Sequence, residues 1–327
     1  MSQLILNAIG DIDKDITLVT DPDLTVGADQ VLVAIEAAVI NPVDLMIAAG
    51  QYGFQAKPPF ALGTEGVGRV TAAGASVDQA LVGRRVIILP NYQQGTWADE
   101  VVVDARNVVP VTDEGDPAQL ALVATNPLTA HLLLTRYVDL QPGDWVGQNL
   151  GSSTVGQYVL GLAKRAGLKV LSVVRSEEAA DRLRRQGAGL VVVDGNDLTE
   201  RIKAELGGQQ LKLVLDGAGD ATVGALASAL EFEGTLVSYS SVTGQPVPVG
   251  LGDSIYRQLK LRGIWIVNWL QNSTPEEIAS TYGELAELVA QGVLSAEVEA
   301  SYPVTEYREA LDHARRPGRT GKIVFRP

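Results

Sequence analysis

The chain of 327 residues contains no cysteine and only two histidines, His131 and His313. The missing cysteines exclude disulfide bonds, thiolate metal sites and cysteine nucleophiles. Two imidazole side chains are too few for a multi-histidine metal site. We therefore expect a protein that works without a bound metal.

Positive charge and long apolar runs are also scarce. The chain has 26 Lys and Arg against 39 Asp and Glu, a formal net charge of -13 at pH 7, so nucleic acid and anionic membranes should be repelled. No apolar run approaches the roughly 18–20 residues that span a bilayer. The first residues lack the basic and apolar segments of a secretory leader. We expect a cytoplasmic protein with neither a nucleic-acid nor a membrane partner.

The stretch 144–175 predicts one β-α-β unit. An apolar run at 145–150 leads through a turn of small residues to a helical pattern at 155–166, and a second apolar run follows at 170–174. The turn has the pattern G-x-S-x-x-G, in which a serine replaces the middle glycine of the usual dinucleotide fingerprint. Its residues are Gly151, Ser152, Ser153, Thr154, Val155 and Gly156.

Each small residue of this turn has an expected task. Gly151 should take backbone angles that a Cβ forbids, Ser153 should let a pyrophosphate approach, and Gly156 should let the helix lie close to the strand. The start of the helix offers free N–H groups and a positive dipole end to phosphates. The alternative is an ordinary tight turn without a ligand.

Arg175 ends the second apolar run. The residue at this place is usually acidic when the ligand is NAD, because a carboxylate binds the ribose diol, whereas a cation suits the 2′-phosphate of NADP. The pattern therefore favours NADPH as the cofactor. A solvated arginine that follows a strand is the alternative.

The rest of the chain predicts two domains. Residues 1–123 contain short apolar runs separated by glycine and proline turns, which is typical of a small β-barrel. Strand and helix patterns alternate from 124 to 267, which predicts a parallel sheet with helices on both faces. The last residues read as a strand that returns to the first part. A barrel-like domain at 1–123 and 268–327 is thus interrupted by a doubly wound domain at 124–267.

Two elements near the end of the second domain are also predicted. The apolar run at 259–267 should be its last strand, and Pro275 should begin a helix that reaches about residue 291. Ser273 or Thr274 should cap that helix.

Seven segments carry a resemblance to a known family. They are AAVINPVDLMIAAGQYG at 37–53, GTEGVGRV at 63–70, GTWADEVVV at 95–103, ATNPLTA at 124–130, LQPGDWVGQNLGSSTVGQ at 140–157, VVR at 173–175 and LKLRGIWIVNW at 259–269. In these motifs, and over nearly its whole length, the chain resembles the medium-chain dehydrogenase/reductase superfamily. It is similar to the zinc-free quinone oxidoreductases and most similar to the trans-2-enoyl thioester reductases of the mitochondrial type. The resemblance implies an α/β fold, with a GroES-like β-barrel catalytic domain and an inserted Rossmann domain that binds NADPH.

The resemblance also implies roles for single residues. Zinc-using members carry cysteine and histidine where this chain has Asn41 and Thr64, so it implies a zinc-free enzyme. Tyr52 matches the proposed proton donor of the enoyl reductases, and a surface contact is the alternative. Asn41 faces either the substrate cleft or a turn, and Glu65 is expected to have a structural role. Asn126 matches a residue near the nicotinamide, and the alternative is a cap for the helix at 128–137.

The remaining implied contacts belong to the cofactor cleft. Loops at the carboxyl ends of parallel strands line such a cleft. Trp265 and Lys322 match family contacts too, with a core tryptophan and a surface lysine as the alternatives. The loop residues in question are Tyr239, Ser240, Ser241 and Val242.

The function implied is NADPH-dependent reduction of activated C=C bonds, above all those of 2-enoyl thioesters. A hydride would pass to the β carbon and a proton to the α carbon. The alternatives are a zinc-free NADPH:quinone oxidoreductase and a cofactor-binding protein without turnover. The expected partners are an acyl-thioester or small-molecule substrate and a second copy of the chain, joined through the segment 259–269.

Overall fold

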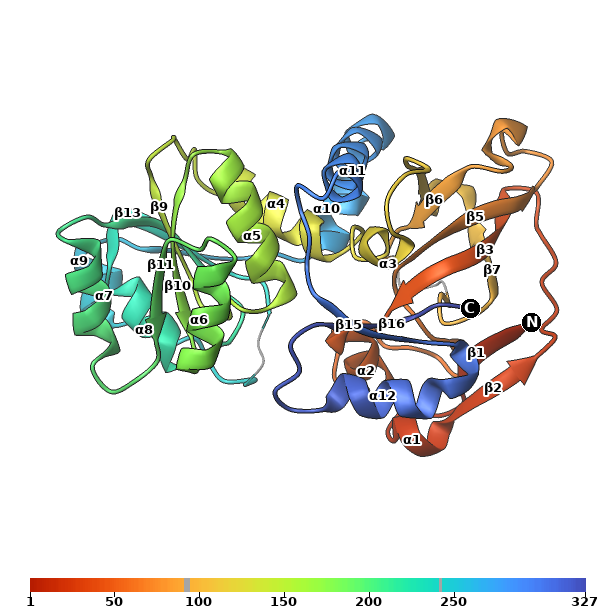
Figure 1. The fold of residues 1–327 in the computed structure, drawn as a ribbon, viewed down its shortest axis with the longest axis horizontal. Helices are drawn as coiled ribbons and strands as arrows, with labels where there is room; N and C mark the ends of the chain where they lie inside the picture. The colour runs from red at the N-terminus through yellow and green to blue at the C-terminus, as the bar shows by residue number, and fades with distance from the viewer. Residues whose placement is uncertain (91–94, 241–242) are drawn as a thin grey trace. The chain divides into compact units, whose positions relative to one another are not determined.

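The computed structural model describes residues 1–90, 95–240 and 243–327, which form two compact units (Figure 1). The first unit comprises Met1–Leu128 and Val267–Pro327, and the second comprises Thr129–Ile266. The sequence had placed the boundaries at 123/124 and 267/268. The chain crosses between the units within two helices, α4 (Asn126–Thr135) and α10 (Ile266–Asn272), and a helical pattern contains no signal for a domain boundary.

The long strand β3 (Gln30–Val39) is the centre of the first unit. Its side chains alternate between half-buried and buried from Gln30 to Ala37, as a strand with one face on a core requires, and the last three residues are all buried. It belongs to a sheet of the order β15-β16-β3-β5-β6-β8, with β7 also paired to β3. The other strands of this sheet are β5 (Gly66–Ala73), β6 (Arg85–Ile88), β7 (Glu100–Asp104), β8 (Val108–Pro110), β15 (Val298–Tyr302) and β16 (Lys322–Phe325).

A smaller sheet of the order β2-β1-β4 completes the β structure of the first unit. Trp97 is buried between the sheets, where its indole N–H donates to the Val39 carbonyl over 2.9 Å and its ring meets Phe325 edge-on. Phe325 lies in β16, which pairs with β3, so the predicted return of the last strand to the first domain is confirmed. The remaining elements are β1 (Ser2–Leu6), α1 (Ile12–Asp15), β2 (Ile16–Thr20), α2 (Pro42–Ala48), β4 (Phe60–Ala61), α3 (Pro117–Leu120), α11 (Pro275–Ala290), α12 (Tyr307–Arg315) and three 3-10 turns at Gln79–Leu81, Ala105–Asn107 and Val304–Glu306.

The second unit is a parallel sheet of the order β11-β10-β9-β12-β13-β14. Helices α5 and α6 lie on one side of it and α7 and α8 on the other (Figure 1). The strand order reverses between β9 and β12, and in such sheets ligands bind beyond the carboxyl ends of the strands at that point. Its elements are β9 (Trp145–Gln148), α5 (Thr154–Arg165), β10 (Lys169–Val174), α6 (Glu177–Arg185), β11 (Leu190–Val193), α7 (Leu198–Leu206), β12 (Leu211–Asp216), α8 (Ala221–Ala227), β13 (Leu230–Ser238), α9 (Leu251–Tyr256) and β14 (Lys260–Gly263).

The predicted last strand at 259–267 is too long. Only Lys260–Gly263 is extended, and Ile266 already begins α10. A short apolar run has no clear period, so sequence alone does not separate a strand from the start of a helix. The next helix, α11, follows the prediction, and Thr274 is its cap because its hydroxyl accepts the Glu277 N–H over 3.2 Å.

Candidate functional site

The turn between β9 and α5 is built around Ser153. Ser153 caps α5, and its Oγ accepts the Gly156 N–H over 3.1 Å. The amides of Thr154 and Val155 lie in the first helical turn, where the helix itself has no carbonyl that could accept them. With Ser152 just before the cap, these amides and the positive end of the helix dipole form a place where a phosphate can bind.

The two glycines of this turn are required for space. A Cβ on Gly151 would lie 2.7 Å from the Ser172 Cβ, and a Cβ on Gly156 would lie 2.5 Å from the Gly151 carbonyl oxygen. The prediction that Gly151 supplies the unusual backbone angle is wrong, because the residue with positive φ (51°) is Leu150. The missing side chains therefore allow the turn to pack closely against β10 and the start of α5, and a non-glycine residue makes the left-handed bend.

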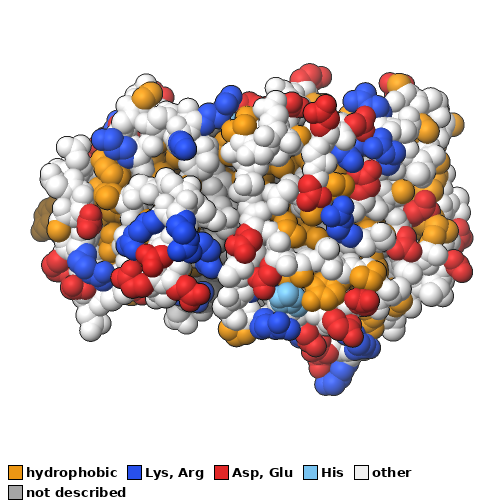
Figure 2. Space-filling view, in the orientation of Figure 1, with side chains coloured by type: hydrophobic (Ala, Val, Ile, Leu, Met, Phe, Trp, Pro, Cys, Tyr) orange, Lys and Arg blue, Asp and Glu red, His pale blue; other side chains and the backbone are white. Residues whose placement is uncertain are grey.

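Arg175 lies at the same edge of the sheet as this turn. It follows β10 directly, and β10 is paired in parallel with β9, so both strands end at the same edge. The Arg175 side chain is exposed, and among the described residues it has no ion pair or side-chain hydrogen bond. Arg182, Arg184 and Arg185 lie in the last turn of α6, at the far end of the helix from Arg175, and Arg184 pairs with Asp181 over 2.9 Å. Figure 2 shows basic and acidic side chains together over this helix. An anion beyond the ends of β9 and β10 would thus meet the positive charge of Arg175.

Sequence reasoning missed a buried network that ties three loops to this edge. The Asn149 amide donates to Asp216 Oδ1 over 2.7 Å, and Asn149 Oδ1 accepts the Gly217 N–H over 2.8 Å. Asp216 also accepts the Gly219 N–H and the Ser238 hydroxyl. The loops after β9, β12 and β13 are therefore fixed to one another. The sequence did contain a signal for this network, because each of these polar residues lies at the end of a predicted strand.

The loop after β13 contributes Tyr239 and Ser240. The Tyr239 N–H donates to the Asp216 carbonyl over 2.9 Å, and its ring covers Gly217, where a Cβ would lie 2.5 Å from the phenol oxygen. Burial raises the pKa of the Tyr239 phenol above its ordinary value, so it remains neutral. Ser240 is exposed beside it. Ser241 and Val242, also predicted to contact the cofactor, lie outside the described residues.

Three other predicted residues converge on Glu65 in the first unit. The side-chain amides of Asn41 and Asn126 both donate to Glu65 Oε1, and the Lys322 ammonium donates to Asn41 Oδ1. The cluster forms because β3 pairs with both β5 and β16, which brings the end of β3 to the starts of the other two strands. Glu65 is fully buried and Lys322 is 6% exposed, so the alternative of a surface lysine is wrong.

Burial dominates the electrostatics of this cluster. Desolvation raises the pKa of Glu65 and lowers the pKa of Lys322, while each group partly stabilises the charge of the other. Burial also raises the pKa of Asp44 from 3.8 to about 6, although its carboxylate accepts the Asn41 N–H over 2.8 Å. The first unit thus contains carboxyl and ammonium groups that can change protonation near neutral pH.

Asn126 does not cap a helix, contrary to one sequence-based alternative. Helix α4 begins at Asn126 itself, and the Asn126 N–H donates to the Leu122 carbonyl over 3.2 Å. The preceding turn accepts the backbone N–H of Asn126, and the asparagine side chain donates to Glu65.

Tyr52 and Trp265 are both partly open to solvent. Tyr52 is half-buried in the loop after α2 and packs against a small apolar cluster that contains Ile47, Ala56 and Val267. Its carbonyl accepts the Gln55 amide over 2.8 Å, which stabilises the loop. Trp265 lies between β14 and α10 and is 39% exposed, so it is no core residue of the second unit.

Neither histidine belongs to a described group of side chains that could hold a metal ion. His131 is in α4, and His313 in α12 contacts the Tyr302 hydroxyl and the Glu299 carboxylate over 2.8 and 2.9 Å. Within residues 1–90, 95–240 and 243–327, no three His, Cys, Asp or Glu side chains are grouped as metal ligands would be. In the same ranges, no helix has the length and apolar character needed to cross a membrane.

Comparison with known proteins places these features in a family. A family model described as "Alcohol dehydrogenase GroES-like domain" matches residues 27–113, and one described as "Zinc-binding dehydrogenase" matches residues 154–282. The mitochondrial enoyl-[acyl-carrier-protein] reductase of Rattus norvegicus is 34% identical over 96% of this chain and 85% of its own length. The human protein of the same name is 32% identical over 98% of this chain and 87% of its own length.

Solved structures confirm the expected α/β fold. A putative NADPH:quinone reductase from Bacillus thuringiensis has a TM-score of 0.92 at 24% identity and covers 100% of this chain and 98% of its own. A mycobacterial protein complexed with NADPH has a TM-score of 0.86 at 25% identity and full coverage of both chains. The Etr1p complex with NADP and crotonyl-CoA has a TM-score of 0.84 at 22% identity, with 100% and 99% coverage. The GroES-like domain with an inserted Rossmann domain is thus the fold of this chain.

The prediction of a cytoplasmic protein is wrong, because the curated relatives are mitochondrial proteins. It rested on the lack of a leader-like segment, and such an absence says nothing about the compartment. The predicted enzyme class is confirmed, since the relatives are named as reductases and their similarity covers almost the whole chain. The chain is an oxidoreductase of the medium-chain dehydrogenase/reductase superfamily and belongs to the family of the mitochondrial enoyl-[acyl-carrier-protein] reductases.

Proposed function

We propose that this protein uses NADPH to reduce the C=C bond of 2-enoyl thioesters. The single observation that carries the proposal is the turn with Ser153 at the start of α5, with the exposed Arg175 at the neighbouring strand end. This arrangement offers amides to a pyrophosphate and a cation to a 2′-phosphate. The names of the relatives, and the NADP and crotonyl-CoA in the Etr1p complex, support the choice of cofactor and substrate.

The residues of the second unit fit the nucleotide. Gly151 and Gly156 let the turn pack closely against β10 and the start of α5, and the amides of Thr154 and Val155 in the first turn of α5 would bind the pyrophosphate. The loop of Tyr239 and Ser240 borders the same sheet edge. When bound, NADPH would supply the hydride that is added to the β carbon of the substrate.

The residues of the first unit would handle the proton and the substrate. Tyr52 would donate a proton to the α carbon, as a tyrosine hydroxyl can in general acid catalysis. Asn41, Asn126 and Lys322 surround the buried Glu65, and this cluster would hold the polar end of the cofactor or the thioester. Trp265 is exposed enough to cover a bound substrate.

We also propose that the protein is a homodimer joined through β14. All four residues of this edge strand, KLRG, are exposed, and the unpaired backbone groups of an exposed edge can pair with another strand. Leu261 in β14 is 58% exposed and Tyr256 in the preceding helix is 81% exposed. Pairing of β14 with its symmetry mate would cover this surface by an isologous contact.

A quinone reductase is the second candidate function. The fold likeness to the Bacillus thuringiensis protein, at a TM-score of 0.92, favours it. One assay separates the candidates: NADPH oxidation at 340 nm with crotonyl-CoA, with a soluble benzoquinone, or with neither. We expect turnover of crotonyl-CoA to exceed turnover of the quinone at least tenfold in kcat/KM. Faster quinone reduction would reject the proposal, and no turnover of either would leave a cofactor-binding protein.

A further inference from the structure

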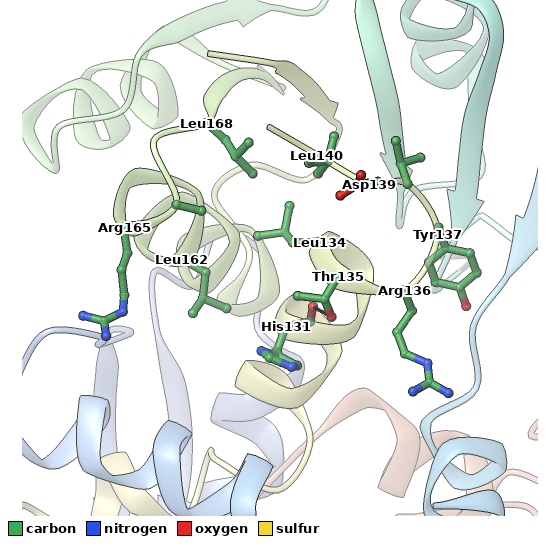
Figure 3. Close-up of a pocket in the computed structure, with 12 residues that line it drawn as sticks. His131, Leu134, Thr135, Arg136, Tyr137, Asp139, Leu140, Leu162, Arg165 and Leu168 are labelled. Atoms are coloured by element: carbon green, nitrogen blue, oxygen red, sulfur yellow. Dashed lines mark hydrogen bonds between the residues drawn. The ribbon is translucent and has the colours of Figure 1, made fainter. Parts of the chain in front are cut away.

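The second unit contains a cavity of about 670 Å³ that the proposed chemistry does not use. It is lined by the last turns of α4 and α5 and by the connection that follows α4 (Figure 3). Cavities that hold small molecules usually measure about 300–1,000 Å³, so this one is large enough for a ligand.

One part of the cavity is apolar. Leu134, Leu140, Leu162 and Leu168 line it together with Val138. Figure 3 shows the four leucines in the upper and central part of the view, with His131 below them, Arg165 to their left and Arg136 to their lower right. Contact with an apolar chain would remove these leucine surfaces from water, which is favourable in proportion to the area covered.

The other part of the cavity is basic. Arg165 is the last residue of α5, it is exposed, and within the described part of the chain its guanidinium has no ion pair or side-chain hydrogen bond. Arg136 adds a second positive charge. Asp139 is the only acidic residue of the lining, and it already accepts the Gln141 amide over 3.0 Å. A chain with a net charge of -13 thus presents a locally basic rim beside an apolar wall.

We propose that this cavity binds a free fatty acid, with its hydrocarbon chain on the leucines and its carboxylate at Arg165. An apolar wall selects a tail, and a guanidinium at the rim selects a carboxylate through charge-assisted hydrogen bonds. Neither feature alone would distinguish a fatty acid from an alkane or from a small anion. The proposal does not depend on the reductase activity, because it concerns equilibrium binding only.

The cavity is distinct from the nucleotide turn. Leu168 precedes β10 and Leu140 precedes β9, so the cavity lies at the amino ends of these parallel strands, whereas the turn around Ser153 lies at their carboxyl ends. Helix α5 runs from one to the other, and its 12 residues at 1.5 Å each place Thr154 and Arg165 about 17 Å apart. A fatty acid and NADPH can therefore be bound at the same time.

The test is isothermal titration of the full-length protein, saturated with NADP⁺, with monomeric decanoate. Arg165→Ala should weaken decanoate about five- to tenfold, because one charge-assisted contact at an open rim is lost. Ala166→Trp, at an exposed lining position, should fill the cavity and abolish binding. Arg185→Ala is the matched control, since Arg185 is the exposed last residue of α6 and does not line the cavity. It should bind decanoate like the wild type.

Three further ligands test which chemical groups the cavity recognises. Acetate has the charge without the tail and should not bind, and decanol has the tail without the charge and should bind equally to wild type and Arg165→Ala. Decanoyl-CoA, which offers phosphates in place of the carboxylate, should not compete with decanoate. Absence of saturable decanoate binding, or equal affinity in Arg165→Ala and wild type, would overturn the proposal. Displacement of decanoate by crotonyl-CoA would do the same, because it would assign the fatty acid to the substrate site.

Discussion

The Asn149 side chain and the Asp216 carboxylate are joined by a fully buried hydrogen bond of 2.7 Å, although 67 residues separate them in the sequence. The bond connects the ends of β9 and β12, the two strands between which the order of the sheet reverses. That reversal is where an open α/β sheet binds its ligand. The pair therefore fixes the loops that would hold the nucleotide.

Asp216→Ala should destabilise the second unit by about 2–4 kcal/mol, because it removes the buried carboxylate that accepts hydrogen bonds from the Asn149 amide, the Gly219 N–H and the Ser238 hydroxyl. Affinity for NADPH should fall as well, since the loops lose their common anchor. Urea unfolding and fluorescence titration measure the two effects. Glu200→Ala, at an exposed position in α7, is the control and should change stability by less than about 0.5 kcal/mol. Wild-type stability in Asp216→Ala would contradict this account.

Arg175→Ala should weaken NADPH about tenfold or more and leave NADH nearly unchanged. The reason is that only NADPH carries the 2′-phosphate. A charge-assisted hydrogen bond contributes roughly 1.5–3 kcal/mol to binding, and a tenfold change in affinity corresponds to about 1.4 kcal/mol. Titration of both cofactors into wild type and variant measures the difference. Equal weakening of the two cofactors would show that Arg175 contacts something other than the 2′-phosphate.

Asp44→Asn should make the protein more stable at pH 7.5 and change little at pH 4. Burial raises the pKa of Asp44 from 3.8 to about 6, so the folded protein binds more protons than the unfolded chain between these values. Stability of the wild type therefore falls as pH rises through this window, by about 3 kcal/mol in total. Asparagine keeps an acceptor for the Asn41 N–H and has no charge to desolvate. Urea unfolding at both pH values tests this, and equal effects of the substitution at both would refute it.

The sequence predicted the parts of the fold that depend on local pattern. The β-α-β unit at 144–175 was found because its apolar periods and small-residue turn are adjacent in the chain. The pattern did not show that Leu150, rather than Gly151, takes the left-handed bend. Backbone angles in a turn depend on what packs around it, here the side chain of Ser172.

The buried clusters could not be predicted for a related reason. Asn126 meets a carboxylate 61 residues away, and Lys322 meets Asn41 at a separation of 281 residues. Such contacts are created by strand pairing, in this case of β3 with β5 and β16. The resemblance named Asn41, Asn126 and Lys322 one by one, and only the structure shows that the two asparagines bind Glu65 and that Lys322 joins them through Asn41.

The wild-type protein should be a dimer at micromolar concentration, and Leu261→Glu should make it a monomer. Glutamate in the middle of β14 would place two like charges close together across a two-fold axis, which opposes strand pairing. Size-exclusion chromatography with light scattering gives the masses. Val293→Glu is the matched control, since Val293 is an exposed apolar residue of the first unit. A wild-type monomer, or a dimer that survives Leu261→Glu unchanged, would contradict the proposed interface.

Tyr52→Phe should lower kcat with crotonyl-CoA by roughly 10² to 10⁴ while the affinity for NADPH stays the same. The substitution keeps the ring that packs against Ile47 and Ala56 and removes only the hydroxyl, so the loop should hold its position. Hydride addition to the β carbon creates an enolate, and a donor that still holds its proton at neutral pH must complete the reaction. Tyr302→Phe, which removes the hydroxyl that contacts His313 outside the proposed site, is the control and should retain full turnover. A solvent isotope effect on kcat that is present in the wild type and lost in Tyr52→Phe would identify the hydroxyl as the donor, whereas wild-type turnover in Tyr52→Phe would mean that another group protonates the α carbon.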